Sequence, residues 1–147
     1  MLNAAIGAVF EEWTDNLAAI AMSEPAATPV ERGRRAWAAM LEGLPANRAL
    51  LLSYVEALAQ AERTESLRTR FAEHYRRCRA TVAELVARSL DDGTEPGDPR
   101  CQAVASFVIS ICDGLAVQWL LDPDGAPTSD TLTAGLDAMW AASFPGR

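Results

Sequence analysis

The chain has 147 residues, of which 50% are hydrophobic and 22% are charged, and its formal net charge is −7. This length and composition fit one globular domain with a substantial core, and they exclude a disordered chain. The acidic charge repels a phosphate backbone and disfavours nucleic-acid binding by this chain alone. No uninterrupted apolar run approaches the roughly 20 residues of a membrane span, and no signal peptide opens the chain, so we expect a soluble, cytoplasmic protein.

The sequence predicts an all-α fold, a bundle-like domain of six helices, because every long segment has helical periodicity and none alternates like a strand. The first helix is expected over residues 2–22. Its apolar stripe is already in register at Leu2, as expected for a segment that continues further upstream. The second helix is expected to begin after Thr28, which forms a capping box with Glu31, and to end near Gly43.

The two middle helices are bounded by turn and capping residues. The third is expected to follow Pro45, and the fourth to run from its cap at Thr64 to about Leu90. The stretch "DDGTEPGDP", Asp91–Pro99, is dense in glycine, proline and acidic residues, and we interpret it as the clearest loop.

The last two helices follow the same logic. Asp98 and Pro99 are expected to cap and begin the fifth helix, and Asp122 with the proline after it to end it. A second polar loop, "PDGAPTSD", leads to a sixth helix over about residues 129–143.

The fifth helix is unusual because it is apolar around most of its circumference, which indicates burial on two sides. We expect one side to pack in the domain's own core and the other against a partner subunit. Gly114 costs about 1 kcal/mol in a helix relative to alanine, so we expect a close helix crossing there, between subunits or within one subunit. Asp113 is expected at the rim of that contact. The predicted dimer interface comprises Val108, Ile109, Cys112, Asp113, Gly114, Ala116, Val117, Leu120, Leu136, Met139 and Trp140.

Three stretches carry a resemblance to a known family: "PANRALLLSYVEALAQAERTESLR", "RFAEHYRRCRATVAELV" and "SICDGLAVQWLLDP". Together with the helix order and the two loops, they resemble the C-terminal ligand-binding and dimerisation domain of tetracycline-repressor-like (TetR-family) regulators. The resemblance implies that residues 1–147 form one such domain, that the family's N-terminal helix-turn-helix DNA-binding domain is absent from this chain, and that the chain begins where the first helix after that domain would begin. It also implies a small-molecule pocket among the first four helices and a four-helix dimer bundle made by the last two.

The function predicted from this resemblance is that of a regulatory domain of a transcriptional repressor. An apolar or amphipathic effector would bind the domain and alter DNA binding by the missing helix-turn-helix domain. The alternative is a stand-alone helical module that binds another protein through its last helices. The reading frame upstream of Met1 distinguishes the two, because a basic helix-turn-helix there favours the regulator.

The candidate ligand-binding residues are aromatic and polar side chains on the inner faces of the first four helices. Aromatic residues at helical spacing are core residues first, but their abundance fits an aromatic-lined pocket. His74 is either a polar ligand contact or a locally bonded core histidine, and Arg34 either a ligand counter-ion or an arginine lying along apolar surface. The full set is Phe10, Trp13, Arg34, Trp37, Met40, Tyr54, Phe71, His74 and Tyr75.

The sequence does not favour an enzyme, a metal site or a cofactor. It contains no nucleophile–base pattern, no glycine-rich phosphate loop and no paired carboxylates on an inner helix face. His74 and Cys78 are four residues apart, as two metal ligands on a helix can be, but two ligands do not make a site.

Overall fold

The computed structural model describes residues 12, 14–16, 19–20, 23, 28–90 and 92–143, and all regular secondary structure within them is helical. This confirms the predicted all-α class. The described residues between 12 and 20 are helical, as predicted for the first helix, most of which lies outside the described residues. The other helices are α2 (Pro29–Gly43), α3 (Arg48–Ala61), α4 (Glu65–Leu90), α5 (Pro99–Leu121) and α6 (Ser129–Ser143).

The predicted capping residues begin the helices they were expected to begin. The Thr28 amide donates to Glu31 Oε2 at 2.7 Å, and the Glu31 amide donates to Thr28 Oγ1 at 3.3 Å, so the capping box of α2 is complete. Asp98 accepts from the Arg100 amide at 2.8 Å at the start of α5. These local bonds satisfy amides that have no partner within the helix.

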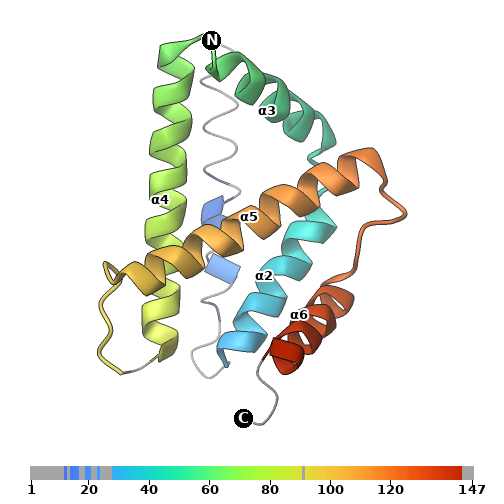
Figure 1. The fold of residues 1–147 in the computed structure, drawn as a ribbon. Helices are drawn as coiled ribbons and strands as arrows, with labels where there is room; N and C mark the ends of the chain where they lie inside the picture. Colours follow the sequence, from blue (N-terminus) through green and yellow to red (C-terminus); the bar gives the residue numbers. More distant parts are fainter. Residues whose placement is uncertain are drawn as a thin grey trace.

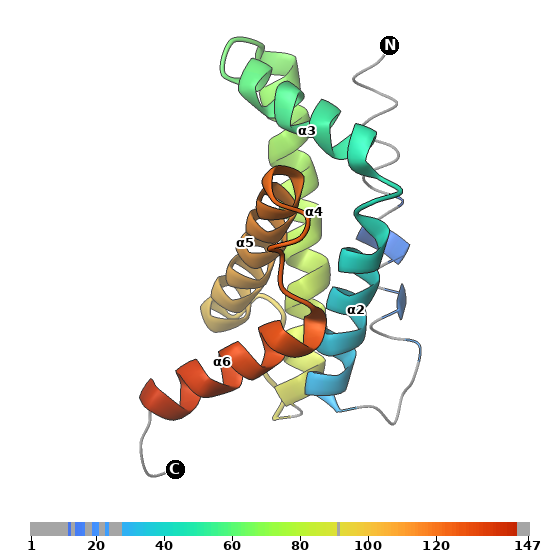
Figure 2. The same cartoon turned by 90° about the vertical axis from the view of Figure 1, so that its right-hand side faces the viewer.

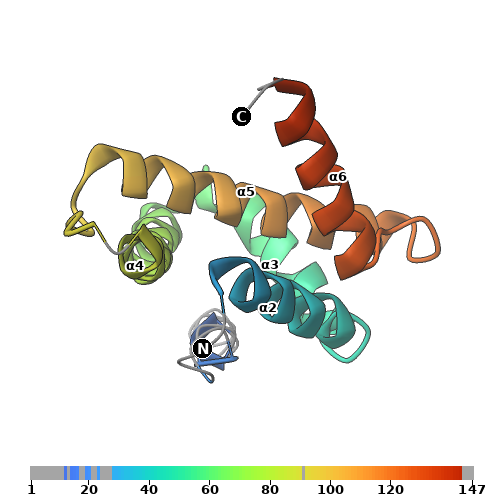
Figure 3. The same cartoon turned by 90° about the horizontal axis from the view of Figure 1, so that it is seen from below.

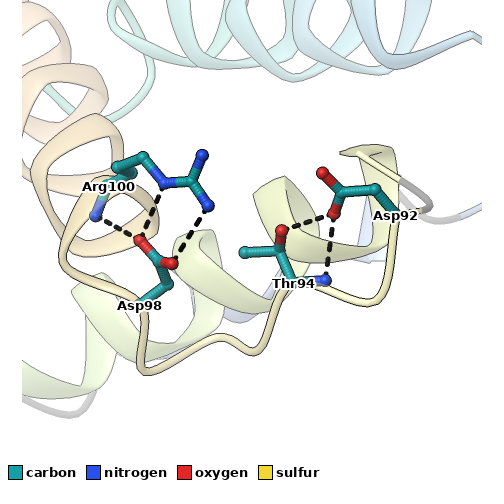
Figure 4. Close-up of polar contacts among 4 residues, drawn as sticks. All are labelled: Asp92, Thr94, Asp98 and Arg100. Carbon is teal, nitrogen blue, oxygen red and sulfur yellow. Dashed lines mark hydrogen bonds and ion pairs between the residues drawn. The ribbon is translucent and has the colours of Figure 1, made fainter.

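The loop between α4 and α5 is held by two local polar pairs (Figure 4). Asp92 accepts a hydrogen bond from the Thr94 amide at 3.0 Å and another from its hydroxyl. The Arg100 guanidinium pairs with Asp98 at 3.1 Å, and these bonds hold the pKa of the Asp98 carboxyl below its usual value. Because the two residues of each pair are close in sequence, these local interactions stabilise the conformation of the loop that leads into α5.

The tightest helix contact is the crossing of α4 and α5, which Figures 1 and 3 show from two sides. Four small buried residues, Ala83, Ala87, Cys101 and Ala105, form the cluster at this crossing. Side chains of this size let two helix backbones approach closely, and Val82 and Val86 pack around the cluster. We call this cluster the crossing core.

The remaining helices frame the other half of α5. Helix α3 contacts both α4 and α5, while α2 contacts α5 and α6 (Figure 2). Helix α6 leads away from α5 and is linked to α2 by an exposed ion pair, Arg34 Nε to Asp130 Oδ1 at 3.8 Å. Helices α2, α3, α4 and α5 thus surround one region of the domain.

Among the described helices, α5 is the one long and apolar enough to cross a membrane by length and composition. It meets that test through its average composition, although polar residues interrupt its apolar runs. Mostly buried core helices of soluble proteins pass the same test, whereas only 11% of this stretch of α5 is buried. Here α5 packs against α4 and also lines a cavity.

Candidate functional site

A cavity of about 570 Å³ lies among α2, α3, α4 and α5. Its volume falls within the range of pockets that hold small molecules, roughly 300–1,000 Å³. The wall is overwhelmingly apolar, and α4 and α5 supply most of it. Thr14 from the N-terminal segment also contributes. Its size and apolar wall suit a molecule that is largely hydrophobic.

Five of the nine predicted ligand-binding residues line this cavity, and their contact with a ligand stays a prediction. They come from three different helices, so the chain brings together side chains up to 38 positions apart. These residues are Trp37, Met40, Tyr54, His74 and Tyr75.

The other four predicted residues are not placed on the cavity wall. Arg34 pairs with Asp130 at the surface, because it points toward α6 rather than toward α4 and α5. The structure gives no support to its predicted role as a ligand counter-ion, and Arg32 is the arginine of α2 that lines the cavity. Phe71 lies behind the wall, edge-to-face against Tyr54 with ring centroids 5.2 Å apart, and is a packing residue. Phe10 and Trp13 lie outside the described residues.

A chain of hydrogen bonds crosses the cavity from α3 to α5. The Tyr54 hydroxyl donates to the Tyr75 hydroxyl at 2.9 Å, and the Tyr75 hydroxyl donates to Asp113 Oδ2 at 2.7 Å. Tyr54 is buried, whereas Tyr75 and Asp113 are half-buried. The three residues provide a polar group of fixed geometry within an otherwise apolar wall.

Burial shifts the acid–base properties of this chain. It raises the pKa of Tyr75 to about 12 and raises that of Tyr54 further, so both phenols stay protonated at neutral pH. Burial also raises the pKa of the Asp113 carboxyl, while the Tyr75 hydroxyl and the nearby His74 act in the opposite direction. Its neighbours therefore offset only part of the cost of burying its charged form.

The thiol groups of two cysteines on the cavity wall have side-chain partners. Cys78 Sγ lies 3.4 Å from His74 Nε2, one turn away on α4, and Cys112 is hydrogen-bonded to Trp37. Burial raises the pKa of the Cys112 thiol to about 11, which keeps it protonated and unreactive. No group of three potential metal ligands occurs among the described residues.

Seven residues assigned to the dimer interface line the cavity in this structure, and their contact with a partner subunit stays a prediction. One of them, Asp113, is hydrogen-bonded to Tyr75. Both apolar sides of α5 have helical spacing, and spacing alone does not tell which side turns toward the cavity. The seven are Val108, Ile109, Cys112, Asp113, Ala116, Val117 and Leu120.

The outward side of α5 carries Phe107, Gly114 and Leu121, spaced seven residues apart and therefore on one face. Phe107 is 53% exposed and Leu121 is 83% exposed. A Cβ placed on Gly114 would meet no described atom within 4 Å, so no crossing among the described residues explains this glycine. On α6, Leu136 is half-buried and Met139 exposed, and the Trp140 side chain lies outside the described residues.

Comparison with protein families gives a match over residues 29–145 to the family model described as "BetI-type transcriptional repressor, C-terminal". The chain belongs to this branch of the TetR family. Comparisons with curated proteins and with solved structures gave no match. The match confirms the predicted family and identifies a non-enzymatic regulatory domain of a kind that generally binds effectors and dimerises.

Within this TetR-family domain, sequence reasoning did not include Asp113 among the residues of the cavity, although it lines the cavity wall. A carboxylate and a glycine in the middle of an apolar helix were a visible signal, but they belong to different faces. Asp113 points to the cavity, while Gly114, one position on, has open space around it. Adjacent residues on a helix are about 100° apart, so the pair need not share one explanation.

Proposed function

We propose that this chain is the effector-binding and dimerisation domain of a cytoplasmic TetR-like repressor. An apolar or amphipathic small molecule would occupy the cavity among α2–α5 and, without any cofactor, alter DNA binding by a helix-turn-helix domain joined to the N-terminal segment. The observation that carries this proposal is the apolar cavity of about 570 Å³ with its single polar chain of Tyr54, Tyr75 and Asp113.

Ligand binding changes DNA binding only if the ligand prefers one arrangement of the domain over another. The cavity wall is suited to such a preference because it is shared among several helices. Tyr54, Tyr75 and Asp113 stand on α3, α4 and α5, so a ligand that displaces or completes this chain acts on three helices at once. Thr14 brings the N-terminal segment, the expected connection to the DNA-binding domain, to the same cavity.

A thermal-shift screen with a library of apolar and amphipathic compounds tests the proposal. Compounds that bind the folded chain raise its melting temperature, and the same compounds should change operator affinity in the protein that includes the upstream reading frame. A chain that no compound stabilises would contradict effector binding.

The dimer is proposed to form through the outward face of α5, together with α6. The exposed side chains Val104, Phe107 and Leu121 provide an apolar strip, and Met139 extends it on α6. Gly114 lies in the middle of this strip, where the absence of a side chain allows a second α5 to cross closely. An interface of this kind typically buries roughly 800 Å² per partner or more.

Light scattering tests the dimer, which should have twice the monomer mass of 15.8 kDa. Phe107→Glu places a charge in the proposed interface and should yield monomers, whereas Leu52→Glu, at an exposed leucine of α3, should leave the dimer intact. Gly114→Leu should weaken the dimer by overpacking. A wild-type chain that is monomeric at micromolar concentration would contradict the proposal.

The same strip would serve the alternative function, a stand-alone module that binds a different protein. The family match favours the regulator. A basic helix-turn-helix upstream of this chain would decide between the two, because an interaction module has no need of one.

A further inference from the structure

The cavity holds one acidic residue among the described residues that line it, and that residue is Asp113. A carboxylate has about four positions at which it can accept hydrogen bonds. The Tyr75 hydroxyl fills one of them, on Oδ2, and among the described residues it is the one hydrogen-bond donor to this side chain. Asp113 is only half-buried and lines the cavity, so this carboxylate is accessible to a ligand there.

From this placement we propose that the effector is an apolar molecule with one protonated amine, whose N–H groups donate to Asp113. The proposal rests on the effector-binding function and specifies its ligand class. The apolar wall takes the hydrocarbon or aromatic body, and the carboxylate takes the ammonium in a charge-assisted hydrogen bond. A buried charge is costly in such a wall, and an ammonium adds to the partial compensation that Tyr75 and the nearby His74 provide.

The aromatic residues around the carboxylate support the same ligand class. Trp37, Tyr54 and Tyr75 line the cavity, and the faces of aromatic rings attract cations. Tyr75 is fixed by its two hydrogen bonds, and Phe71 packs edge-to-face on Tyr54 from behind. These residues are held in place before a ligand arrives, which reduces the ordering cost of binding.

Arg32 also lines the cavity and is the residue that would instead favour an anionic ligand. It stands in the first turn of α2, and it already has an interaction partner. Asp113, in contrast, stands next to Tyr75 in the aromatic part of the wall. The ligand's charge is therefore set by Asp113, and an anionic probe provides the direct counter-test.

Four probes that share one body separate the possibilities by isothermal titration calorimetry. They are 4-phenylbutylamine, 4-phenylbutanol, 4-phenylbutyrate and trimethyl(4-phenylbutyl)ammonium. The titrations are run at pH 8, where an aliphatic amine is still protonated. We expect the amine to bind at least about tenfold more tightly than the alcohol, the carboxylate most weakly, and the quaternary ion, which has no N–H, below the amine.

Asp113→Asn keeps the shape of the side chain and an acceptor for Tyr75 but removes the charge. It should bring the amine and the alcohol to within about threefold of each other while the alcohol's own affinity changes little. Asp137→Asn, the same change on the exposed surface of α6, is the matched control and should leave the tenfold preference intact. Tyr75→Phe keeps the carboxylate and should keep the preference, which shows that charge rather than the hydrogen-bond chain selects the amine.

The outcomes distinguish this inference from the function on which it rests. Equal binding of amine and alcohol by the wild type, or an amine preference that survives Asp113→Asn, would overturn the inference while leaving effector binding in place. Failure of all four probes to bind also overturns it. Failure of the wider compound library would overturn effector binding itself.

Discussion

Helices α4 and α5 pack closely in one region and border a cavity in another. At the crossing core, Ala83, Ala87, Cys101 and Ala105 bring the helices into close contact, and all four are buried. Further along α5, larger side chains line an open cavity of about 570 Å³. The same pair of helices therefore provides close packing at the crossing core and a binding volume beside it, with Val82 and Val86 shared by both regions.

The largest effect is expected from adding volume at the crossing core. Ala105 is fully buried there, so Ala105→Leu should destabilise the chain by about 1–3 kcal/mol or more through overpacking. Ala116→Leu, the same substitution on the cavity wall, has free space to enter and should change stability by less than about 1 kcal/mol. Urea denaturation followed by circular dichroism measures both. Equal losses for the two variants would contradict the contrast between close packing and cavity.

A smaller effect is expected from breaking the hydrogen-bond chain. Tyr75→Phe removes the middle residue and leaves the half-buried Asp113 without its hydroxyl donor, which should cost about 1–3 kcal/mol. Tyr54→Phe removes only the terminal hydroxyl and should cost about 1 kcal/mol. The difference in unfolding free energy between the two variants is the measurement. A larger loss for Tyr54→Phe would show that the chain does not end on Asp113 as described.

The smallest effect concerns the pH dependence of stability. Burial raises the pKa of Asp113 above its usual 3.8, so the folded state binds this proton more readily than the unfolded state. The stabilisation is therefore fully present below the ordinary carboxyl pKa and is lost as pH rises through the raised value. The titratable groups that interact with Asp113 are Tyr54 on α3, His74, Tyr75 and Cys78 on α4, and Cys112 on α5. Arg32 of α2 lines the same cavity.

Asp113→Asn isolates this contribution, because both proteins share every other titrating group. As pH falls from 7 toward 4, the wild type should gain stability relative to the variant. Exposed carboxyls with lowered pKa values, such as Asp92 and Asp98, lose stabilising interactions over the acidic range in both proteins and cancel in the difference. A difference that does not change with pH would contradict a buried, titrating Asp113.

Much of the fold could be predicted from the sequence because its signals are local. The capping residues Thr28 and Asp98 and the breakers in the two loops act within a few positions, and α2–α6 begin and end close to where these signals predicted. Which side of α5 faces the cavity could not be predicted in the same way. The two apolar sides of α5 have the same helical spacing in the sequence. Only the position of α4 decides that Ala105 packs in the crossing core and that Cys112 borders the cavity.

Local sequence patterns predict only part of the candidate site. Trp37, Tyr54 and Tyr75 share inner faces that periodicity identifies, but Arg34 and Arg32 both lie near such a face, and their assignment depends on where α6 lies. The place of Asp113 in the site depends on its contact with Tyr75, which lies 38 residues away in the sequence, so no local pattern contains it.

The most direct test of the central claim, that the cavity is the effector site, is a thermal-shift screen run in parallel on the wild type and on Ala116→Trp. The added indole enters the cavity from the wall of α5 and occupies the volume that a ligand needs. Compounds present at about 100 times their dissociation constant should stabilise the wild type by about 2.7 kcal/mol and leave the melting temperature of Ala116→Trp unchanged. Equal stabilisation of both proteins by the same compounds would place the binding site elsewhere and contradict the account.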